Sequence, residues 1–222
     1  MDLNRLDRKL IVSCQPVPGG PMDRADIVAA FALAALDGGA AGLRIESVAN
    51  VSAVRAATAA PIIGLVKRDL SDSPVRITPW LEDVTALSRA GADIIAFDAT
   101  ERPRPVPVAD LIAAAHGAGR LAMADCSSAP DAKAALAAGA DIVGSTLSGY
   151  TGDRTPDGPD YALLEELRRL TPRVVAEGRV KTPDEAARAL ARGAWCVVVG
   201  SAITRTEHVT SWFAGALAKD PR

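Results

Sequence analysis

Two ionisable residues stand at the ends of apolar runs, and together they could move a proton. Lys67 follows the run 61–66, and Glu177 follows the run 174–176. Burial in apolar surroundings disfavours a charged amine and depresses the pKa of a lysine, which suits a general base or a Schiff-base amine. A lysine and a carboxylate that face one another suit removal of a proton from carbon and its return on the opposite face.

Both residues also have a structural interpretation. Lys67 could be an ammonium ion paired with Asp69 or with another carboxylate at a strand end, where it would hold the fold closed. Glu177 could be the ion-pair partner of Arg179 or Arg44. Position in the sequence does not decide between the structural and the chemical role.

Small residues after the last two apolar runs could bind an anion. Gly178, Gly200 and Ser201 offer backbone N–H groups there, and Arg205 and Arg179 could add charge-assisted hydrogen bonds. Glycines at strand ends are common in α/β proteins, so the residue types alone are a modest signal. Their position favours phosphate, because barrel enzymes often build a phosphate site after their seventh and eighth strands.

A metal site is the less favoured interpretation of the remaining carboxylates. Asp98 and Asp125 could hold a divalent cation together with Glu177. However, the two histidines, His116 and His208, both fall in helical segments away from the strand ends. We therefore expect no metal, and we expect one aspartate to bind sugar hydroxyls and the other to support the barrel wall, with Asp98 equally able to cap a turn.

The chain alternates strand-like apolar runs with alanine-rich segments of helical spacing, such as DIVAAFALAALDGG (26–39) and PDEAARALARG (183–193). Glycine at the end of such a segment is typical of a helix C-terminus. A weak repeat, in which Gly-Ala or Ala-Gly precedes an apolar run, marks the return from helix to strand. We expect strands at 9–15, 41–47, 61–69, 93–100, 121–128, 141–149, 173–180 and 196–204.

This alternation predicts an α/β fold, namely a single (β/α)8 TIM barrel formed by one domain over residues 1–222. A doubly wound open sheet is the second choice. The long gaps at 68–80, 100–107 and 150–158 all follow strands, on the face where barrels keep their active sites.

Composition limits the partners of the chain. With 25 basic and 27 acidic residues and no basic tract, we expect no binding to nucleic acid, and no apolar run is long enough to span a membrane. Three cysteines, Cys14, Cys126 and Cys196, indicate reduced thiols in a cytoplasmic protein. No nucleotide-binding glycine motif follows a strand, so we expect no nucleotide or redox cofactor. We also expect a homodimer.

Taken together, the motifs closely resemble the N-acetylmannosamine-6-phosphate 2-epimerases, the bacterial barrel enzymes of sialic acid breakdown. The matching segments cover the chain nearly end to end and include LIVSCQPVPGGP (10–21), PIIGLVKRD (61–69), GADIIAFDATERPRP (91–105), VVAEGRVKTPDEA (174–186) and VVVGSAITR (197–205). The resemblance implies that Lys67 and Glu177 are the catalytic pair. It also implies sugar contacts from Gln15, Arg44 and Asp125, and phosphate contacts from Gly178, Gly200, Ser201 and Arg205.

The resemblance implies an epimerase that interconverts N-acetylmannosamine 6-phosphate and N-acetylglucosamine 6-phosphate by moving the proton at C2. Two alternatives remain at this point. One is another phosphosugar barrel enzyme in which Lys67 forms an imine. The other is a sugar-phosphate binding protein without catalytic activity.

Overall fold

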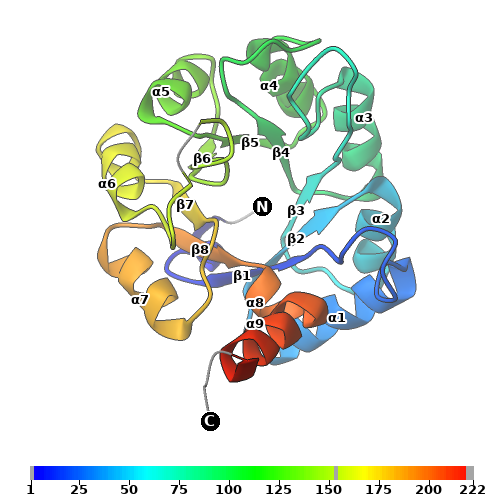
Figure 1. Ribbon diagram of the computed structural model, residues 1–222. Helices are drawn as coiled ribbons and strands as arrows, with labels where there is room; N and C mark the ends of the chain where they lie inside the picture. The colour runs from blue at the N-terminus through cyan, green and yellow to red at the C-terminus, as the bar shows by residue number, and fades with distance from the viewer. Residues whose placement is uncertain (1–2, 153–154, 219–222) are drawn as a thin grey trace.

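The chain folds as a closed barrel of eight parallel strands, which follow one another in sequence order around the ring. The computed structural model describes residues 3–152 and 155–218. Figure 1 shows the strands as an inner ring with the helices outside it. The strands are β1 (Leu10–Cys14), β2 (Gly42–Glu46), β3 (Ile62–Leu65), β4 (Ile94–Asp98), β5 (Leu121–Asp125), β6 (Ile142–Gly144), β7 (Val174–Glu177) and β8 (Cys196–Val199).

Each strand is followed by a connection that contains a helix. A short 3-10 helix, η1 (Leu3–Leu6), precedes β1, and two helices follow β8. The helices are α1 (Ala25–Asp37), α2 (Val48–Ala57), α3 (Leu81–Ala90), α4 (Val108–Gly117), α5 (Ala129–Ala137), α6 (Tyr161–Leu170), α7 (Pro183–Ala191), α8 (Ser201–Thr204) and α9 (Thr206–Ala218). In the part of the chain described, none of these helices is long and apolar enough to cross a membrane.

Parallel pairing of β1 with β8 closes the ring, with Ile11 opposite Val198. The predicted (β/α)8 barrel is therefore confirmed, and the open doubly wound sheet is wrong. Closure gives each of these eight strands a neighbour on both sides, so none of them has an unpaired edge.

The strands are shorter at their carboxyl ends than the sequence predicts. The segment predicted at 61–69 is a strand only over Ile62–Leu65, and Lys67 lies beyond it in an isolated antiparallel bridge with Ile77. The segment predicted at 196–204 is a strand over Cys196–Val199, after which Gly200 begins α8. Apolar residues continue past the true strand ends because the following loops and helices are also packed.

Side chains along the strands alternate between two buried clusters, because successive residues of a strand point to opposite faces. The outer cluster packs the strands against the helices and includes Phe97 and Ile95 of β4. The inner cluster fills the barrel and includes Ile94, Ile63 and Val175, with Leu6 of η1 at its amino-terminal end. On β7 the next inward position beyond Val175 is Glu177, at the carboxyl end of the strand.

Close packing between β3 and α3 gives a prediction for Gly64. A Cβ atom on Gly64 would lie 2.7 Å from the Cβ of Ala92, which is too close for either rigid group to accommodate. We expect Gly64→Ala to lower the free energy of unfolding by about 1–3 kcal/mol through overpacking.

The matched control is Gly117→Ala at the end of α4, where nothing lies within 4 Å of the added methyl group. That variant should be neutral or more stable by up to about 1 kcal/mol. Urea denaturation of both variants measures the difference. Equal stabilities would show that β3 can move away from Ala92.

Candidate active site

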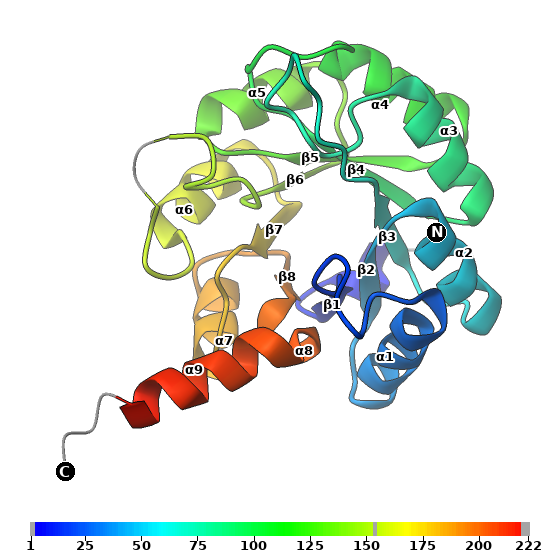
Figure 2. The same ribbon diagram turned by 45° about the vertical axis from the view of Figure 1, so that its right-hand side comes forward.

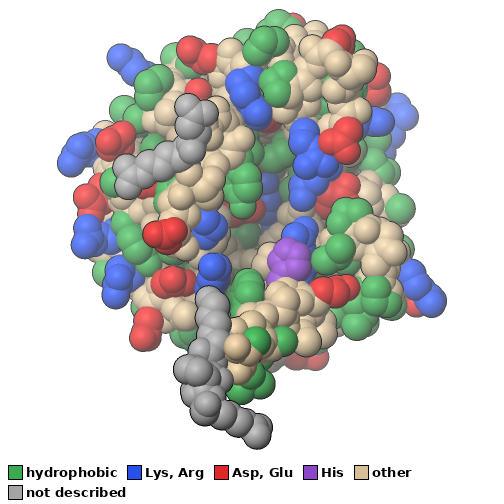
Figure 3. Space-filling model, in the orientation of Figure 1, with side chains coloured by type: hydrophobic (Ala, Val, Ile, Leu, Met, Phe, Trp, Pro, Cys, Tyr) green, Lys and Arg blue, Asp and Glu red, His purple; other side chains and the backbone are tan. Residues whose placement is uncertain are grey.

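A cavity of about 770 Å³ lies at the carboxyl ends of the strands. Figure 3, in the same orientation as Figure 1, shows a hollow in this face with lysine and arginine side chains on its border. Seven of the nine site residues predicted from the sequence line this cavity, namely Gln15, Lys67, Glu177, Gly178, Gly200, Ser201 and Arg205. The other two, Arg44 and Asp125, are almost fully buried, with exposed side-chain fractions of 1% and 0%.

The alternation of the strands explains why these side chains meet. Gln15, Lys67 and Glu177 each stand two residues beyond a residue that points into the barrel interior. They form the uppermost layer of a barrel whose lower layers are largely apolar. The interior thus places ionisable groups from distant parts of the chain at one surface.

Lys67 binds a neutral partner. Its Nζ donates to Oε1 of Gln15 at 2.6 Å, and Nε2 of Gln15 donates to the hydroxyl of Ser13 at 2.8 Å. Lys67 is exposed toward the open cavity, but protein atoms crowd its amine, and this burial is the main cause that lowers the pKa of Lys67. The positive charges of Arg205 and Arg44 lower it further.

The alternative in which Lys67 forms an ion pair with Asp69 is wrong. Asp69 instead accepts a hydrogen bond of 2.6 Å from Arg76 at the exposed end of the same loop. The amine of Lys67 is therefore available to a molecule in the cavity.

Glu177, the last residue of β7, is mostly buried, with 13% of its side chain exposed. Its Oε1 lies 3.1 Å from Nε of Arg44, but the N–H of Nε is not directed at it, so charge rather than an aligned hydrogen bond holds the pair. Burial raises the pKa of Glu177 to about 7, helped by the negative charge of Asp125, while Arg44 and Lys67 oppose the rise. A carboxyl group with this pKa can either give or take a proton near neutral pH.

Arg44 and Asp125 lie beneath the cavity as a buried ion pair. Nη2 of Arg44 donates to Oδ2 of Asp125 at 2.6 Å. The second oxygen of Asp125 accepts from the hydroxyl of Thr146, also at 2.6 Å. Among the alternatives for Glu177, its pairing with Arg44 is thus confirmed.

Arg179 turns away from Glu177. Its guanidinium donates to the backbone oxygens of Ser148 at 2.7 Å and Gly158 at 2.9 Å, and it lies over the ring of Tyr150. The main role of Arg179 in the structure is to hold the loop after β6 against β7. The pairing of Glu177 with Arg179 that the sequence allowed is wrong, although Arg179 does line the cavity.

The ends of β7 and β8 form one side of the cavity, as the sequence predicts. Gly178, Gly200, Ser201 and Arg205 all line it. Gly178 has a φ of +112°, a conformation that side chains rarely adopt, so a glycine is required where the chain turns at the cavity wall. Nε of Arg205 donates to the backbone oxygen of Gln15 at 2.8 Å, which ties α8 to the end of β1.

Several lining residues are absent from the sequence-based site. His208 and Trp212 of α9 border the cavity, so the expectation that both histidines lie away from the strand ends is wrong for His208. The local sequence pattern cannot reveal that His208 borders the cavity, because its position depends on the path of α9 across the barrel. Arg76 and Arg102 also line the cavity. Both lie in the long loops 68–80 and 100–107 that follow strands, and this position could have identified them as site residues from the sequence.

Asp98 is a turn-capping residue. Its Oδ1 accepts from the backbone N–H of Thr100 at 2.9 Å and from the Thr100 hydroxyl at 2.7 Å, and its Oδ2 accepts from Arg102 at 2.5 Å. Arg104 adds hydrogen bonds to the backbone oxygens of Asp98, Thr100 and Val106. The three bonds to the Asp98 carboxylate occupy three of its roughly four lone-pair sites.

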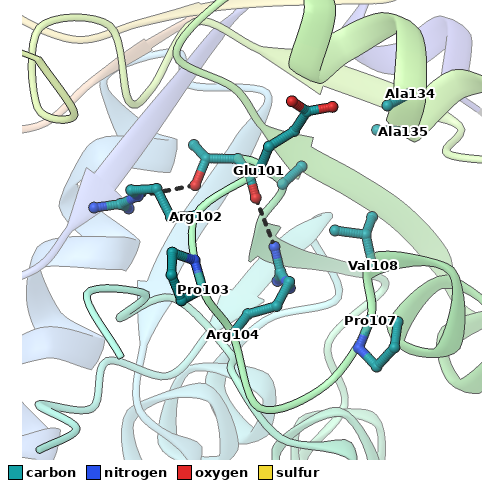
Figure 4. Close-up of a pocket in the computed structure, with 10 residues that line it drawn as sticks. Glu101, Arg102, Pro103, Arg104, Pro107, Val108, Ala134 and Ala135 are labelled. Atoms are coloured by element: carbon teal, nitrogen blue, oxygen red, sulfur yellow. Dashed lines mark hydrogen bonds between the residues drawn. The ribbon is translucent and has the colours of Figure 1, made fainter. Parts of the chain in front are cut away.

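The loop after β4 also borders a second, smaller cavity of about 380 Å³ against α5. Figure 4 shows Arg102 pointing away from Ala134 and Ala135, and Arg104 hydrogen-bonded to a backbone oxygen of its own loop. The two arginines therefore serve the loop, and the space between the loop and α5 receives no convergent polar groups from them.

The chain is similar in sequence to a family and to bacterial proteins that are described as epimerases of N-acetylmannosamine 6-phosphate. A sequence profile of the NanE family, described as “Putative N-acetylmannosamine-6-phosphate epimerase”, matches residues 28–219. A protein of Escherichia coli O9:H4 (strain HS), described as “Putative N-acetylmannosamine-6-phosphate 2-epimerase”, is 57% identical over 98% of this chain and 97% of its own length. A protein of Klebsiella pneumoniae subsp. pneumoniae with the same description is 60% identical over 94% of this chain and 89% of its own length.

A solved structure agrees with the sequence matches. The N-acetylmannosamine-6-phosphate 2-epimerase from Clostridium perfringens superposes with a TM-score of 0.93 at 39% identity, over 97% of this chain and 96% of that one. The fold and the cavity define an enzyme of the (β/α)8-barrel class, with its ionisable groups at the carboxyl ends of the strands. Within that class, the chain belongs to the N-acetylmannosamine-6-phosphate epimerase family.

The donor set of the cavity gives a prediction about metals. The described residues contain no group of three His, Cys, Asp or Glu side chains arranged to hold a metal ion. We expect the melting temperature of EDTA-treated protein to stay unchanged when Mg²⁺, Mn²⁺ or Zn²⁺ is added. A bound metal at about 100 times its Kd would add about 2.7 kcal/mol of stability and raise Tm on the order of 5–10 °C. Such a rise would make Asp98, Asp125 and Glu177 candidate ligands again.

Proposed function

We propose that this protein interconverts N-acetylmannosamine 6-phosphate and N-acetylglucosamine 6-phosphate by moving the proton at C2 of the sugar. One observation carries the proposal: Lys67 and Glu177 line the same cavity, and the pKa of each is shifted toward neutrality. An amine with a lowered pKa and a carboxyl group with a raised pKa suit a reaction that removes a proton and replaces it. Membership of the epimerase family supports the same assignment.

The chemistry requires an acidic C–H bond. The C2 proton of the cyclic sugar is not acidic, so the open-chain aldehyde reacts, because its carbonyl group accepts the electrons of the broken C–H bond and forms an enolate. One group takes the proton, and the other delivers a proton to the opposite face of C2. Lys67 and Glu177 are proposed for these two roles, and Gln15 would hold the lysine amine in place.

The phosphate is proposed to bind at the β7 and β8 side of the cavity. Gly178, Gly200 and Ser201 approach it with their backbone, and Arg205 brings a positive charge. Binding energy from this remote group would position the reacting carbon between Lys67 and Glu177. Arg44 and Asp125 are proposed to hold Glu177 in place from beneath the cavity. They would also form hydrogen bonds to any sugar group that reaches them.

We further propose that the chain works as one domain in the cytoplasm, in amino-sugar and sialic acid catabolism, and without nucleic acid. The three cysteines are buried and unpaired, which suits a reducing compartment. A homodimer is also proposed. Helix α9 extends beyond the barrel in Figure 2 and contains no buried residue, while 70% of Phe213 and 77% of Leu217 are exposed. Apolar side chains of this kind favour a partner copy.

A deuterium experiment with Lys67→Ala tests the function and the base together. Wild-type protein in deuterated water should exchange the C2 proton of N-acetylmannosamine 6-phosphate and form the second epimer, as read by proton NMR. Loss of a general acid–base group costs typically about 10²–10⁴-fold, so Lys67→Ala should lose at least about 100-fold in rate.

Lys133→Ala, on the exposed face of α5, is the matched lysine control and should keep the wild-type rate. Absence of exchange in the wild type would reject the epimerase assignment. Irreversible trapping of Lys67 by borohydride in the presence of substrate would instead indicate an imine mechanism.

Arg205→Ala tests the phosphate end. A hydrogen bond to a charged group contributes about 1.5–3 kcal/mol, so the loss should raise KM on the order of 10–100-fold and lower kcat less. The unphosphorylated sugar should be a poor substrate for the wild type and lose little more in the variant. Arg89→Ala on the exposed side of α3 is the control. Equal damage with both sugars would remove Arg205 from the phosphate site and favour Arg179.

A further inference from the structure

We propose that Thr146 is a positioning residue of this site: its hydroxyl donates to Asp125 and accepts from protonated Glu177, and it thereby keeps Glu177 in the form that gives a proton. The role in turnover rests on the proposed epimerase function, whereas the hydrogen-bonded chain itself does not. Thr146 lies in the turn that follows β6 and lines the main cavity.

The distances determine which carboxylate oxygen receives the hydroxyl proton of Thr146. Oγ1 of Thr146 lies 2.6 Å from Oδ1 of Asp125 and 3.4 Å from Oε2 of Glu177. A hydroxyl group has one proton to donate, and 2.6 Å is a short O–H···O distance while 3.4 Å is a long one. The proton therefore points to Asp125, and the oxygen lone pairs remain on the side of Glu177. Ionised Glu177 would meet these lone pairs unfavourably, but protonated Glu177 can donate to them.

The neighbouring backbone is shaped for this arrangement. Residue 144 is a glycine, and a Cβ atom there would come within 3.0 Å of Oγ1 of Thr146 and 2.8 Å of the methyl group of Met123. The hydroxyl of Ser145 accepts from the backbone N–H of Glu177 at 3.2 Å and donates to its backbone oxygen at 2.9 Å. The turn after β6 thus fixes both the Thr146 hydroxyl and the backbone that carries the Glu177 carboxyl group.

A hydrogen bond donated by Thr146 to Glu177 would lower the pKa of Glu177, but the shorter contact directs the single hydroxyl proton to Asp125. The charged groups around Glu177 agree with this assignment. Arg44 of β2 gives its well-aligned hydrogen bond to Asp125 of β5 and only charge to Glu177. Lys67 after β3 faces Glu177 across the cavity, and Cys196 of β8 is a buried thiol whose pKa is raised by burial first and then by the charge of Glu177. Asp125 therefore accepts two short hydrogen bonds and Glu177 accepts none with good alignment, which favours a proton on Glu177.

The consequence for the reaction can be written as one proton-balanced step. The C2–H bond breaks and its proton passes to the neutral amine of Lys67, while the electrons move into the C1 carbonyl group. The O–H bond of Glu177 then breaks and its proton joins C2 on the other face. The step ends with a Lys67 ammonium ion and a Glu177 carboxylate, and exchange with water restores the starting forms.

The direct test follows the Glu177 carboxyl group by ¹³C NMR in protein labelled at the glutamate side-chain carboxyl carbons. The signal is assigned by its loss in Glu177→Gln, and its titration is measured without substrate. Thr146→Val removes the hydroxyl but keeps the shape, and Arg44 still compensates Asp125. We expect the Glu177 midpoint to fall by about one pH unit in this variant. Thr146→Ser keeps the hydroxyl and should keep the wild-type midpoint.

A midpoint that rises in Thr146→Val would show that the hydroxyl donates to ionised Glu177, and an unchanged midpoint would show that it does not act on Glu177. Either result overturns the proposal, as does a Thr146→Ser midpoint equal to that of Thr146→Val. If Thr146→Val does not fold, Thr146→Ala removes the same hydroxyl with less bulk and is judged by the same criteria.

The kinetic test is separate. If protonated Glu177 is needed, activity falls as pH rises through its pKa, so the alkaline limb of the kcat profile should move by about one unit to lower pH in Thr146→Val and return in Thr146→Ser. If the NMR shift is observed without epimerisation, the hydrogen-bonded chain is supported and the proposed function is rejected. If the wild type epimerises the sugar but the alkaline limb is not shifted in Thr146→Val, the proposed function is supported and the role of Thr146 is rejected.

Discussion

The guanidinium of Arg44 lies inside a barrel whose interior is otherwise largely apolar, and the arrangement of the mouth depends on it. A buried charge is tolerated only when partners compensate it. Asp125 and Glu177 supply that compensation from across the barrel, so one side chain of β2 links the ends of β5 and β7. Removal of Asp125 or of the arginine would leave an uncompensated charge at the centre of the fold.

Unequal sharing of Arg44 places the two carboxyl groups in different electrostatic surroundings. Its aligned hydrogen bond goes to Asp125, and Glu177 is left partly compensated and mostly buried. On the opposite side, Lys67 is held by a neutral amide and lies near the positive charges of Arg205 and Arg44. One carboxyl group and one amine therefore approach neutrality for the same reason, which is that each lacks a full counter-charge in a partly desolvated site.

The sequence predicts the fold well because local and global patterns agree. The alternation of apolar runs with alanine-rich segments repeats around the chain, and closure into a ring follows from eight such units. Strand ends were less predictable. Lys67 looks like a continuation of an apolar strand, yet it leaves the ladder because it bridges to Ile77 in the following loop. The partner of Glu177 and the approach of His208 to the cavity depend on contacts between distant segments, which no local pattern contains.

The hydrogen bond between Arg205 and the backbone of Gln15 joins residues that are 190 positions apart, and it lies beside the pairing of β1 with β8. A chain that emerges from the ribosome amino-terminus first must therefore present β1 as an unpaired edge until almost the whole protein has been synthesised. During that interval Gln15 is in place, but the strand and arginine that complete its surroundings do not yet exist. The mouth of the barrel is thus assembled last, and incomplete chains released early would carry an open, aggregation-prone edge and an unfinished cavity.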